Sequence, residues 1–209
     1  AREILIKDGW RLNETSGIFE KVELYKKTKK PVKTTELAFS LATGDAPGLK
    51  QPAEQIAAVW SELGVKVDLK VFEKSDLNQN IIRARKYDAL FFGEIVGRDP
   101  DLFSFWHSSQ RNDPGLNIAL YTSISADKLL AETRTTADLE KRIELYTKVE
   151  EEIRKDAPAV FLYSPEFLYV LPRVVKKRKM SSIVTNAERF SNNYQWYITT
   201  EKVWNIFLK

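Results

Sequence analysis

The chain has 209 residues, and its hydrophobic fraction of 43% is enough for the core of a globular domain. It contains no cysteine, which excludes a disulfide framework, a thiolate nucleophile and a cysteine-ligated metal site. Lysine and arginine outnumber aspartate and glutamate by only 33 to 29, so the net charge of +4 describes a mixed surface that weakly favours acidic partners.

The first part of the chain predicts a short helix and two strands. Residues 2–8 have helical character and end at Gly9, a residue suited to a left-handed helix cap. Residues 19–25 and 36–42 alternate between apolar and polar side chains, which is typical of strands. No basic and apolar export signal opens the sequence, so we expect any such signal to precede the first residue.

A strand–helix–strand unit follows, with further elements after it. Residues 52–63 carry apolar side chains at helical spacing between a proline and Gly64, and residues 65–71 alternate as a half-buried strand. Residues 75–86 predict a polar helix. Residues 87–92 are apolar apart from Asp88, which favours a strand in the middle of a sheet.

The second half predicts two helices, at residues 126–133 and 139–153, and then two strands, at residues 158–163 and 166–171. All apolar runs are much shorter than the roughly 20 residues that a membrane helix needs. The alternation of strands and helices along the chain indicates the α/β class, with a mixed β-sheet flanked by helices on both faces.

From residue 172 the composition changes to a basic cluster followed by an aromatic tail. No aromatic–basic RNA signature surrounds the cluster, which favours a solvated edge over a nucleic-acid site. Aromatic side chains usually pack, so the tail needs a partner surface. It can fold back on the chain, stay mobile or drive self-association. The basic cluster comprises Arg173, Lys176, Lys177, Arg178 and Lys179, and the aromatic tail comprises Phe190, Tyr194, Trp196, Tyr197, Trp204 and Phe207.

The densest group of chemically versatile residues lies in the loop after the 87–92 strand. Loops at the carboxyl ends of strands line ligand crevices in open α/β sheets, and Glu94 and Arg98 supply opposite charges that can hold the polar ends of a ligand. Asp99 and Asp101 have an alternative role as caps of the next helix. The side chains expected to face a ligand are Glu94, Ile95, Val96, Arg98, Trp106 and His107, with Asn117 and Tyr121 as loop-fixing contacts.

Enzyme chemistry finds little support in the sequence. His107 is the only histidine, so a catalytic triad would have to use it, and its neighbours Ser108 and Ser109 lack the glycine-flanked setting of a nucleophilic serine. With no second histidine and no cysteine, a metal site at His107 is disfavoured. We therefore expect no enzymatic activity, no metal and no cofactor.

Five short motifs in register resemble the solute-binding proteins of the peptide, nickel and oligosaccharide ABC importers, known as family 5. They begin with a helix that steps through a glycine into a strand and continue with an Arg-x-Tyr-Asp entry into the central strand. Each motif alone is common, but their shared order extends over about 160 residues. The motifs are residues 51–67, 85–89, 97–109, 117–130 and 156–163.

The resemblance implies a binding function and a two-lobe protein more than twice this length, whose lobes close on a ligand. Residues 1–171 would be the second, carboxy-terminal lobe, and residues 172–209 would return to pack on the absent first lobe. The implied partners are a peptide or similar polar ligand and an ABC permease, with no nucleic acid. The implied location is periplasmic or at the cell surface, with lipid anchoring left open. The alternatives are a non-transport binding or chaperone-like module of the same fold and, last, a hydrolase.

One departure from the family pattern concerns the ligand. Many peptide-binding members carry a tryptophan directly after the glycine of the central strand and, a few residues later, an aspartate that pairs with the amino terminus of the peptide. This sequence has Glu94 directly after Gly93 and a loop one residue shorter. We hypothesise that the carboxylate of Glu94 replaces that aspartate.

Overall fold

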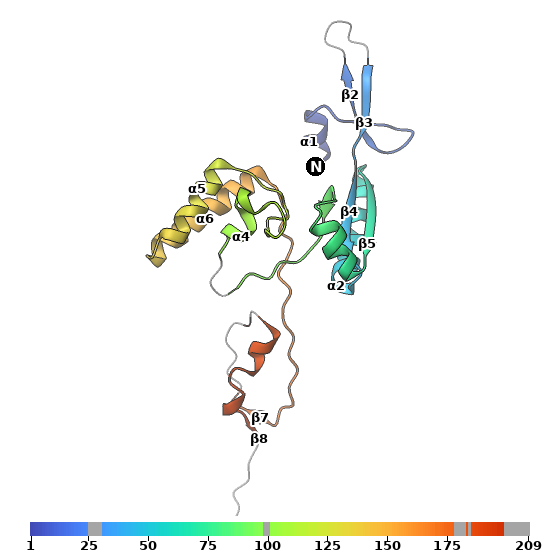
Figure 1. The fold of residues 1–209 in the computed structure, drawn as a ribbon. Coiled ribbons are helices and arrows are strands. Elements are labelled where there is room, and N and C mark those ends of the chain that lie inside the picture. The colour runs from blue at the N-terminus through green and yellow to red at the C-terminus, as the bar shows by residue number, and fades with distance from the viewer. Residues whose placement is uncertain (25–30, 98–100, 178–182, 184, 199–209) are drawn as a thin grey trace, which may run out of the picture.

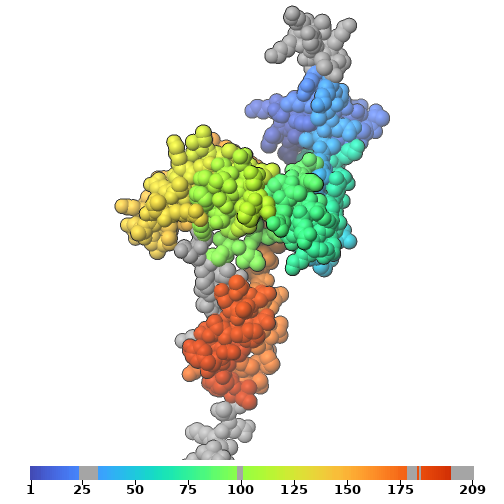
Figure 2. All heavy atoms as spheres, in the orientation of Figure 1, coloured from blue at the N-terminus to red at the C-terminus, as the bar shows by residue number. Residues whose placement is uncertain are grey.

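The structure is a computed structural model that describes residues 1–24, 31–97, 101–177, 183 and 185–198. Its chain runs through an antiparallel hairpin sheet, a small parallel sheet with its helices, a group of helices and an extended tail (Figure 1). In the space-filling view the first three of these parts touch one another, and the tail projects away from them (Figure 2). No helix within the described ranges is long and apolar enough to span a membrane.

The chain begins with helix α1 (Arg2–Lys7), followed by a three-stranded antiparallel sheet. The predicted helix at 2–8 and strand at 19–25 are confirmed, and Gly9 adopts a φ of +90° after the helix. The other two strands of this sheet are additions that the sequence pattern did not predict. The sheet contains β1 (Arg11–Leu12), β2 (Phe19–Leu24) and β3 (Pro31–Glu36), in the order β1-β2-β3.

The parallel sheet has β4 (Ala38–Gly44) at its centre, between β5 (Lys66–Phe72) and β6 (Ala89–Leu90). Its register pairs Ala38 with Lys66, and all three predicted strands are present, although β6 is shorter than the predicted 87–92. Side chains of β4 supply buried core positions, including Leu41 at 4% exposed. The predicted α/β class is therefore confirmed.

Helix α2 (Pro47–Leu63) packs on β4 and β5. The helix begins at Pro47, earlier than the predicted start, so Pro52 lies inside it. Gly64 ends it as predicted, where a φ of +104° suits glycine because it has no Cβ. A Cβ on Gly64 would also approach the ring of Phe19 to 3.0 Å. The Phe19 amide donates a hydrogen bond to the Gly64 carbonyl at 2.8 Å, so this close approach joins the two sheets.

The predicted helix at 75–86 is present in a shorter form. A single turn, α3 (Lys74–Asp76), continues into a π-helical segment, η1 (Leu77–Ile82). The side chain of Glu73 caps this start by accepting a hydrogen bond from the Ser75 amide at 3.1 Å. Leu77 and Ile82 are buried, whereas the backbone leaves the helix before reaching residue 86.

The helical part contains two short turns, α4 (Phe103–Trp106) and η2 (Ser108–Gln110), and two long helices. The long helices α5 (Ile124–Thr135) and α6 (Leu139–Asp156) pack against each other and confirm the predictions at 126–133 and 139–153. Ser123 and Asp138 cap their first turns. The core between them includes Leu130 and Val149, both 0% exposed.

The two strands predicted at 158–163 and 166–171 are wrong for this structure, in which these residues form no ladder. Their apolar side chains lie largely in solvent, with Val160 76% exposed, Leu168 84% and Val170 91%. A strand needs a neighbouring strand to pair its backbone groups, and no other described segment supplies one here. The sequence pattern indicates side chains suited to a strand, but it cannot indicate whether a neighbouring strand is present.

The tail folds back on residues 167–169. Strand β7 (Val175–Lys176) pairs with β8 (Tyr197–Ile198), and Tyr169 packs against Phe190 and Trp196 at ring-centroid distances of 6.2 and 6.4 Å. Two short turns lie between these strands: η3 (Asn186–Phe190) and η4 (Asn193–Gln195). Arg178, Lys179, Trp204 and Phe207 lie outside the described residues.

Two leucines that differ in burial test this assignment of the core. Leu130→Ala removes a side chain that is 0% exposed between α5 and α6, whereas Leu139→Ala removes one that is 61% exposed. We expect the first change to lower the free energy of unfolding by about 2–5 kcal/mol because it leaves a cavity. The second should cost less than about 0.5 kcal/mol. Urea unfolding followed by circular dichroism measures both, and equal losses would contradict the assignment.

Candidate functional site

The loop that follows β6 lies at the surface. Residues 92–97 have no regular structure, and Ile95 is 78% exposed. A Cβ on Gly93 or Gly97 would meet no atom within 4 Å, so neither glycine is required by crowding in this conformation. The structure thus places Glu94, Ile95 and Val96 on an open surface. Arg98 and Asp99 lie outside the described residues.

Glu94 has an unusual electrostatic environment within this exposed loop. The residue as a whole is exposed, yet nearby protein atoms strip water from its carboxyl group and raise the pKa of that group to about 7. Its charge in turn contributes to the raised pKa of Tyr87, after the larger effect of burial. Across the described residues, no cation or hydrogen-bond donor pairs with the Glu94 carboxyl.

Asp101 begins the helical part. It forms an ion pair with Arg134 of α5, and its Oδ1 accepts a hydrogen bond from the Phe103 amide at 3.3 Å. The Arg134 guanidinium, which also lies 3.9 Å from the centre of the Phe103 ring, lowers the pKa of the Asp101 carboxyl. These contacts support the capping role that the sequence left as an alternative for Asp101.

Trp106 is a core residue in this structure. It is 9% exposed, and its ring packs against Tyr121 at 6.2 Å and Phe161 at 5.8 Å between centroids. The structure thus gives the indole a packing role, and its contact with a ligand stays a prediction. A tryptophan between two loops is equally compatible with packing and with ligand contact, so the sequence pattern could not separate the two roles.

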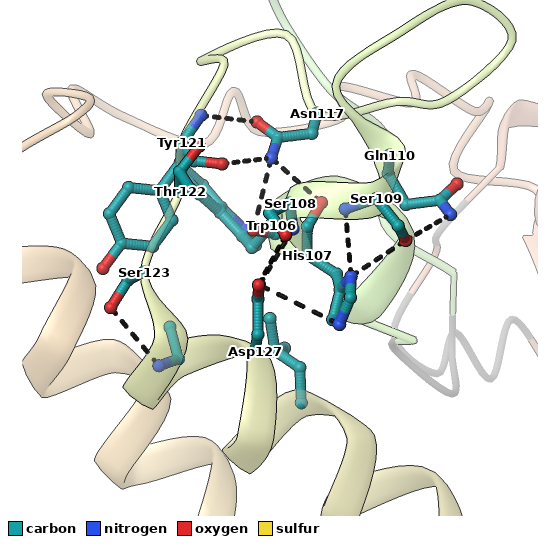
Figure 3. Close-up of polar contacts among 12 residues, drawn as sticks. Trp106, His107, Ser108, Ser109, Gln110, Asn117, Tyr121, Thr122, Ser123 and Asp127 are labelled. Carbon is teal, nitrogen blue, oxygen red and sulfur yellow. Dashed lines mark hydrogen bonds and ion pairs between the residues drawn. The ribbon is translucent and has the colours of Figure 1, made fainter.

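The side chain of Asn117 organises the surrounding loop (Figure 3). It is 0% exposed, and its Nδ2 donates to the carbonyls of His107 at 3.1 Å and Tyr121 at 3.0 Å, with a longer contact to Trp106 at 3.3 Å. Its Oδ1 accepts from the Tyr121 amide at 3.0 Å. The amide thus closes the loop between η2 and α5, and the Tyr121 hydroxyl extends the network to Asp156 at 2.7 Å.

His107 is held by its neighbours in an arrangement unlike a catalytic triad (Figure 3). Its Nδ1 accepts from the Ser109 amide at 3.1 Å and lies 2.8 Å from the Ser109 hydroxyl, while the ring stacks on Phe103 at 4.0 Å. Its Nε2 is 3.9 Å from Asp127, too long for a hydrogen bond. Asp127 instead accepts from the amide and hydroxyl of Ser108, at 2.8 and 2.5 Å.

The arrangement of His107, Ser109 and Asp127 differs from that of a catalytic triad. A nucleophilic serine needs a histidine nitrogen as its base and a carboxylate bonded to the other nitrogen. Here the Ser109 backbone and hydroxyl both contact the same nitrogen, so the group acts as a local cap for η2. The described residues also contain no cluster of three histidine, aspartate or glutamate side chains that could hold a metal ion.

The sequence predicted some of these residues and missed others. The loop-fixing contacts expected of Asn117 and Tyr121 are present, while ligand contact by any of the eight candidate residues remains a prediction. Asp127 was visible as an acidic residue in the first turn of a helix, which suits the helix dipole. Its hydrogen bonds to Ser108, 19 positions earlier, carry no sequence pattern.

Removing the Asn117 amide should destabilise the chain. Asn117→Ala leaves several buried backbone groups without their partner, and each such group costs about 1–3 kcal/mol. We expect the total loss in the free energy of unfolding to be about 3 kcal/mol. The exposed Asn112, in the same loop, provides the matched control Asn112→Ala, which should change stability by less than about 0.5 kcal/mol. Similar effects of the two changes in urea unfolding would show that the Asn117 network does not organise the loop.

Comparisons with known proteins agree with the motif resemblance. No protein-family model matches the sequence. The chain is 27% identical over 177 residues, or 82% of its length, to the oligopeptide-binding protein AppA of Bacillus subtilis. It is 32% identical over 143 residues, or 67% of its length, to the periplasmic oligopeptide-binding protein OppA of Salmonella typhimurium. It spans only 30% and 25% of those two relatives.

The fold is also shared. The solved structure of Bacillus subtilis AppA in complex with a nonapeptide superposes with a TM-score of 0.70, covering 95% of this chain and 37% of that protein at 23% identity. The relatives are binding proteins rather than enzymes. The chain is therefore homologous to part of the family 5 solute-binding proteins, which confirms the family indicated by its motifs.

Proposed function

We propose that this chain is one lobe of a solute-binding protein that captures peptides or similar polar oligomers for an ABC importer. The observation that carries the proposal is its homology to two oligopeptide-binding proteins over 82% and 67% of its length. Binding by such a protein is closure of two lobes about a hinge, with no covalent chemistry. The capping arrangement of His107 and Ser109 is compatible with this non-enzymatic role.

The division of the chain follows the same reasoning. Residues 1–171 would form the second lobe, and residues 172–209 would pack on a first lobe supplied by the rest of a longer protein. The exposed apolar side chains of residues 160–170 support a missing partner surface, because such surface is normally covered. We propose an extracytoplasmic location and a permease partner, in line with the periplasmic relative OppA.

Glu94 is the proposed recognition group for the ligand. Its carboxyl is shielded from water and has no cationic partner among the residues that the structure describes, so a ligand ammonium would complete the pair. Ile95 and Val96, exposed beside it, offer apolar contact to peptide side chains. Arg98 and His107 complete the proposed ligand-facing set.

Substituting the carboxylate tests this role in the protein that carries both lobes. We expect Glu94→Gln to weaken binding of a nonapeptide with a free amino terminus by about tenfold or more, because a charge-assisted hydrogen bond is lost. The same peptide with an acetylated amino terminus should bind wild type and variant equally. Calorimetry measures all four affinities, and Glu140→Gln on α6 is the matched control. An unchanged affinity in Glu94→Gln would reject the role of Glu94.

The raised pKa of Glu94 predicts a pH dependence with a defined sign. The pKa of the Glu94 carboxyl is about 7, so at lower pH the free carboxyl is mostly protonated. It must then release a proton to pair with an ammonium. Affinity for the free-amine nonapeptide should therefore rise between pH 5.5 and pH 7, with proton release on binding. Glu94→Gln should remove this dependence. A wild-type affinity that is flat over the same interval would contradict the assignment.

The 209-residue chain alone should bind poorly. In the proposed two-lobe protein, half of the ligand surface belongs to the other lobe, so the isolated chain cannot enclose a peptide. We expect weak or undetectable heat when this chain is titrated with the nonapeptide, and clear binding by the longer protein. A submicromolar dissociation constant for the chain alone would contradict the two-lobe arrangement.

A further inference from the structure

The described lobe has two halves whose secondary-structure elements pack separately. The sheet half, residues 38–90, contains β4, β5, β6 and α2, and the helical half, residues 101–157, contains α4, α5 and α6. Extensive packing between elements occurs within each half. The two masses touch in the space-filling view (Figure 2). Some other contact must therefore set the orientation of one half against the other.

Three side chains of the sheet half reach across to the helical half. Arg83 forms two hydrogen bonds with the Asp113 carboxylate, both 2.9 Å. Arg85 donates to the carbonyls of Arg111 at 2.8 Å and Gly115 at 2.7 Å. The Tyr87 hydroxyl donates to the carbonyl of Ile118 at 2.6 Å. All the acceptors belong to residues 111–118, which we call the bridging loop.

Arg85 is the centre of this arrangement. Its guanidinium also donates to the carbonyl of Ile82 at 2.7 Å, so one planar group binds both sides of the junction. Its backbone adopts a φ of +53°, a left-handed conformation that a non-glycine residue keeps only where its surroundings hold it. The residue is half-buried, which protects these hydrogen bonds from competition by water.

The bridging loop is tightly built and connects directly to the candidate site. A Cβ on Gly115 would lie 2.2 Å from the Gln110 carbonyl oxygen, so only glycine fits at this point. Asn117, inside the loop, holds the His107 carbonyl at 3.1 Å. The position of His107 therefore depends on the loop, while residues 92–97 depend on the end of β6.

We propose that Arg85 is a positioning residue which, with Arg83 and Tyr87, fixes the bridging loop and thereby sets the orientation of the helical half against the sheet half. It acts through backbone carbonyls and needs no contact with a ligand. An effect of this orientation on solute capture rests on the proposed function, in which the loop 92–97 and His107 together form the ligand surface. The orientation itself is a property of this chain and can be measured without any solute.

A distance measurement between the halves tests the proposal. The chain contains no cysteine, so the double substitution Ala58→Cys on α2 and Lys148→Cys on α6 allows two nitroxide labels at exposed sites. Pulsed electron resonance should give one narrow distance peak. We expect Arg85→Ala to replace this peak with a broad distribution. Arg85→Lys should not rescue the peak, because an ammonium keeps the charge but lacks the forked donors.

A label pair within one half provides the control. Lys128→Cys on α5 with Lys148→Cys should keep its narrow peak in the Arg85 variants, because α5 and α6 pack on each other. A narrow cross-half peak retained in Arg85→Ala would overturn the proposal. If the distance peak of the within-half pair also broadens, the variant Tyr87→Phe, which deletes one hydroxyl, decides. Broadening of the cross-half peak alone in this variant supports the proposal. An unchanged cross-half peak overturns it. No solute is present, so failure of the proposed function leaves these outcomes unaffected.

Discussion

The buried side-chain amide of Asn117 is the contact around which the helical half is organised. One planar group binds the carbonyls of His107 and Tyr121 and the amide of Tyr121, all between 3.0 and 3.1 Å. The His107 carbonyl also accepts from the Gln110 amide at 3.0 Å, and the buried Tyr121 groups rely on the Asn117 side chain, so the loop has little freedom to rearrange. The same loop receives Arg85 from the sheet half, so local hydrogen bonding and the arrangement of the halves depend on one another.

The sequence predicts elements well where local chemistry is sufficient. Helix α2 ends at Gly64 as predicted, and α6 begins after Asp138, whose side chain accepts a hydrogen bond from the Lys141 amide. Apolar spacing then determines which face of each helix is buried. These signals lie within a few residues of one another, so a single sequence is enough to predict these elements.

Other features depend on partners that a local pattern cannot report. The segment 158–171 has the side chains of strands, but no described strand lies beside it. Trp106 packs against Tyr121 and Phe161, and its place after the polar loop did not predict these two partners. Arg85 and Asp127 bind backbone groups at least 19 positions away, and such contacts leave no periodic trace.

Homology and exposed surface lead to one interpretation. The chain matches 30% of AppA and 25% of OppA, and its extended segment exposes apolar side chains that a larger protein would cover.

The most direct test of this account is a crystal structure of the two-lobe protein with the free-amine nonapeptide. The account predicts residues 158–171 in strand ladders and the Glu94 carboxylate within about 3 Å of the peptide ammonium. A peptide bound elsewhere, with residues 92–97 in solvent, would contradict it.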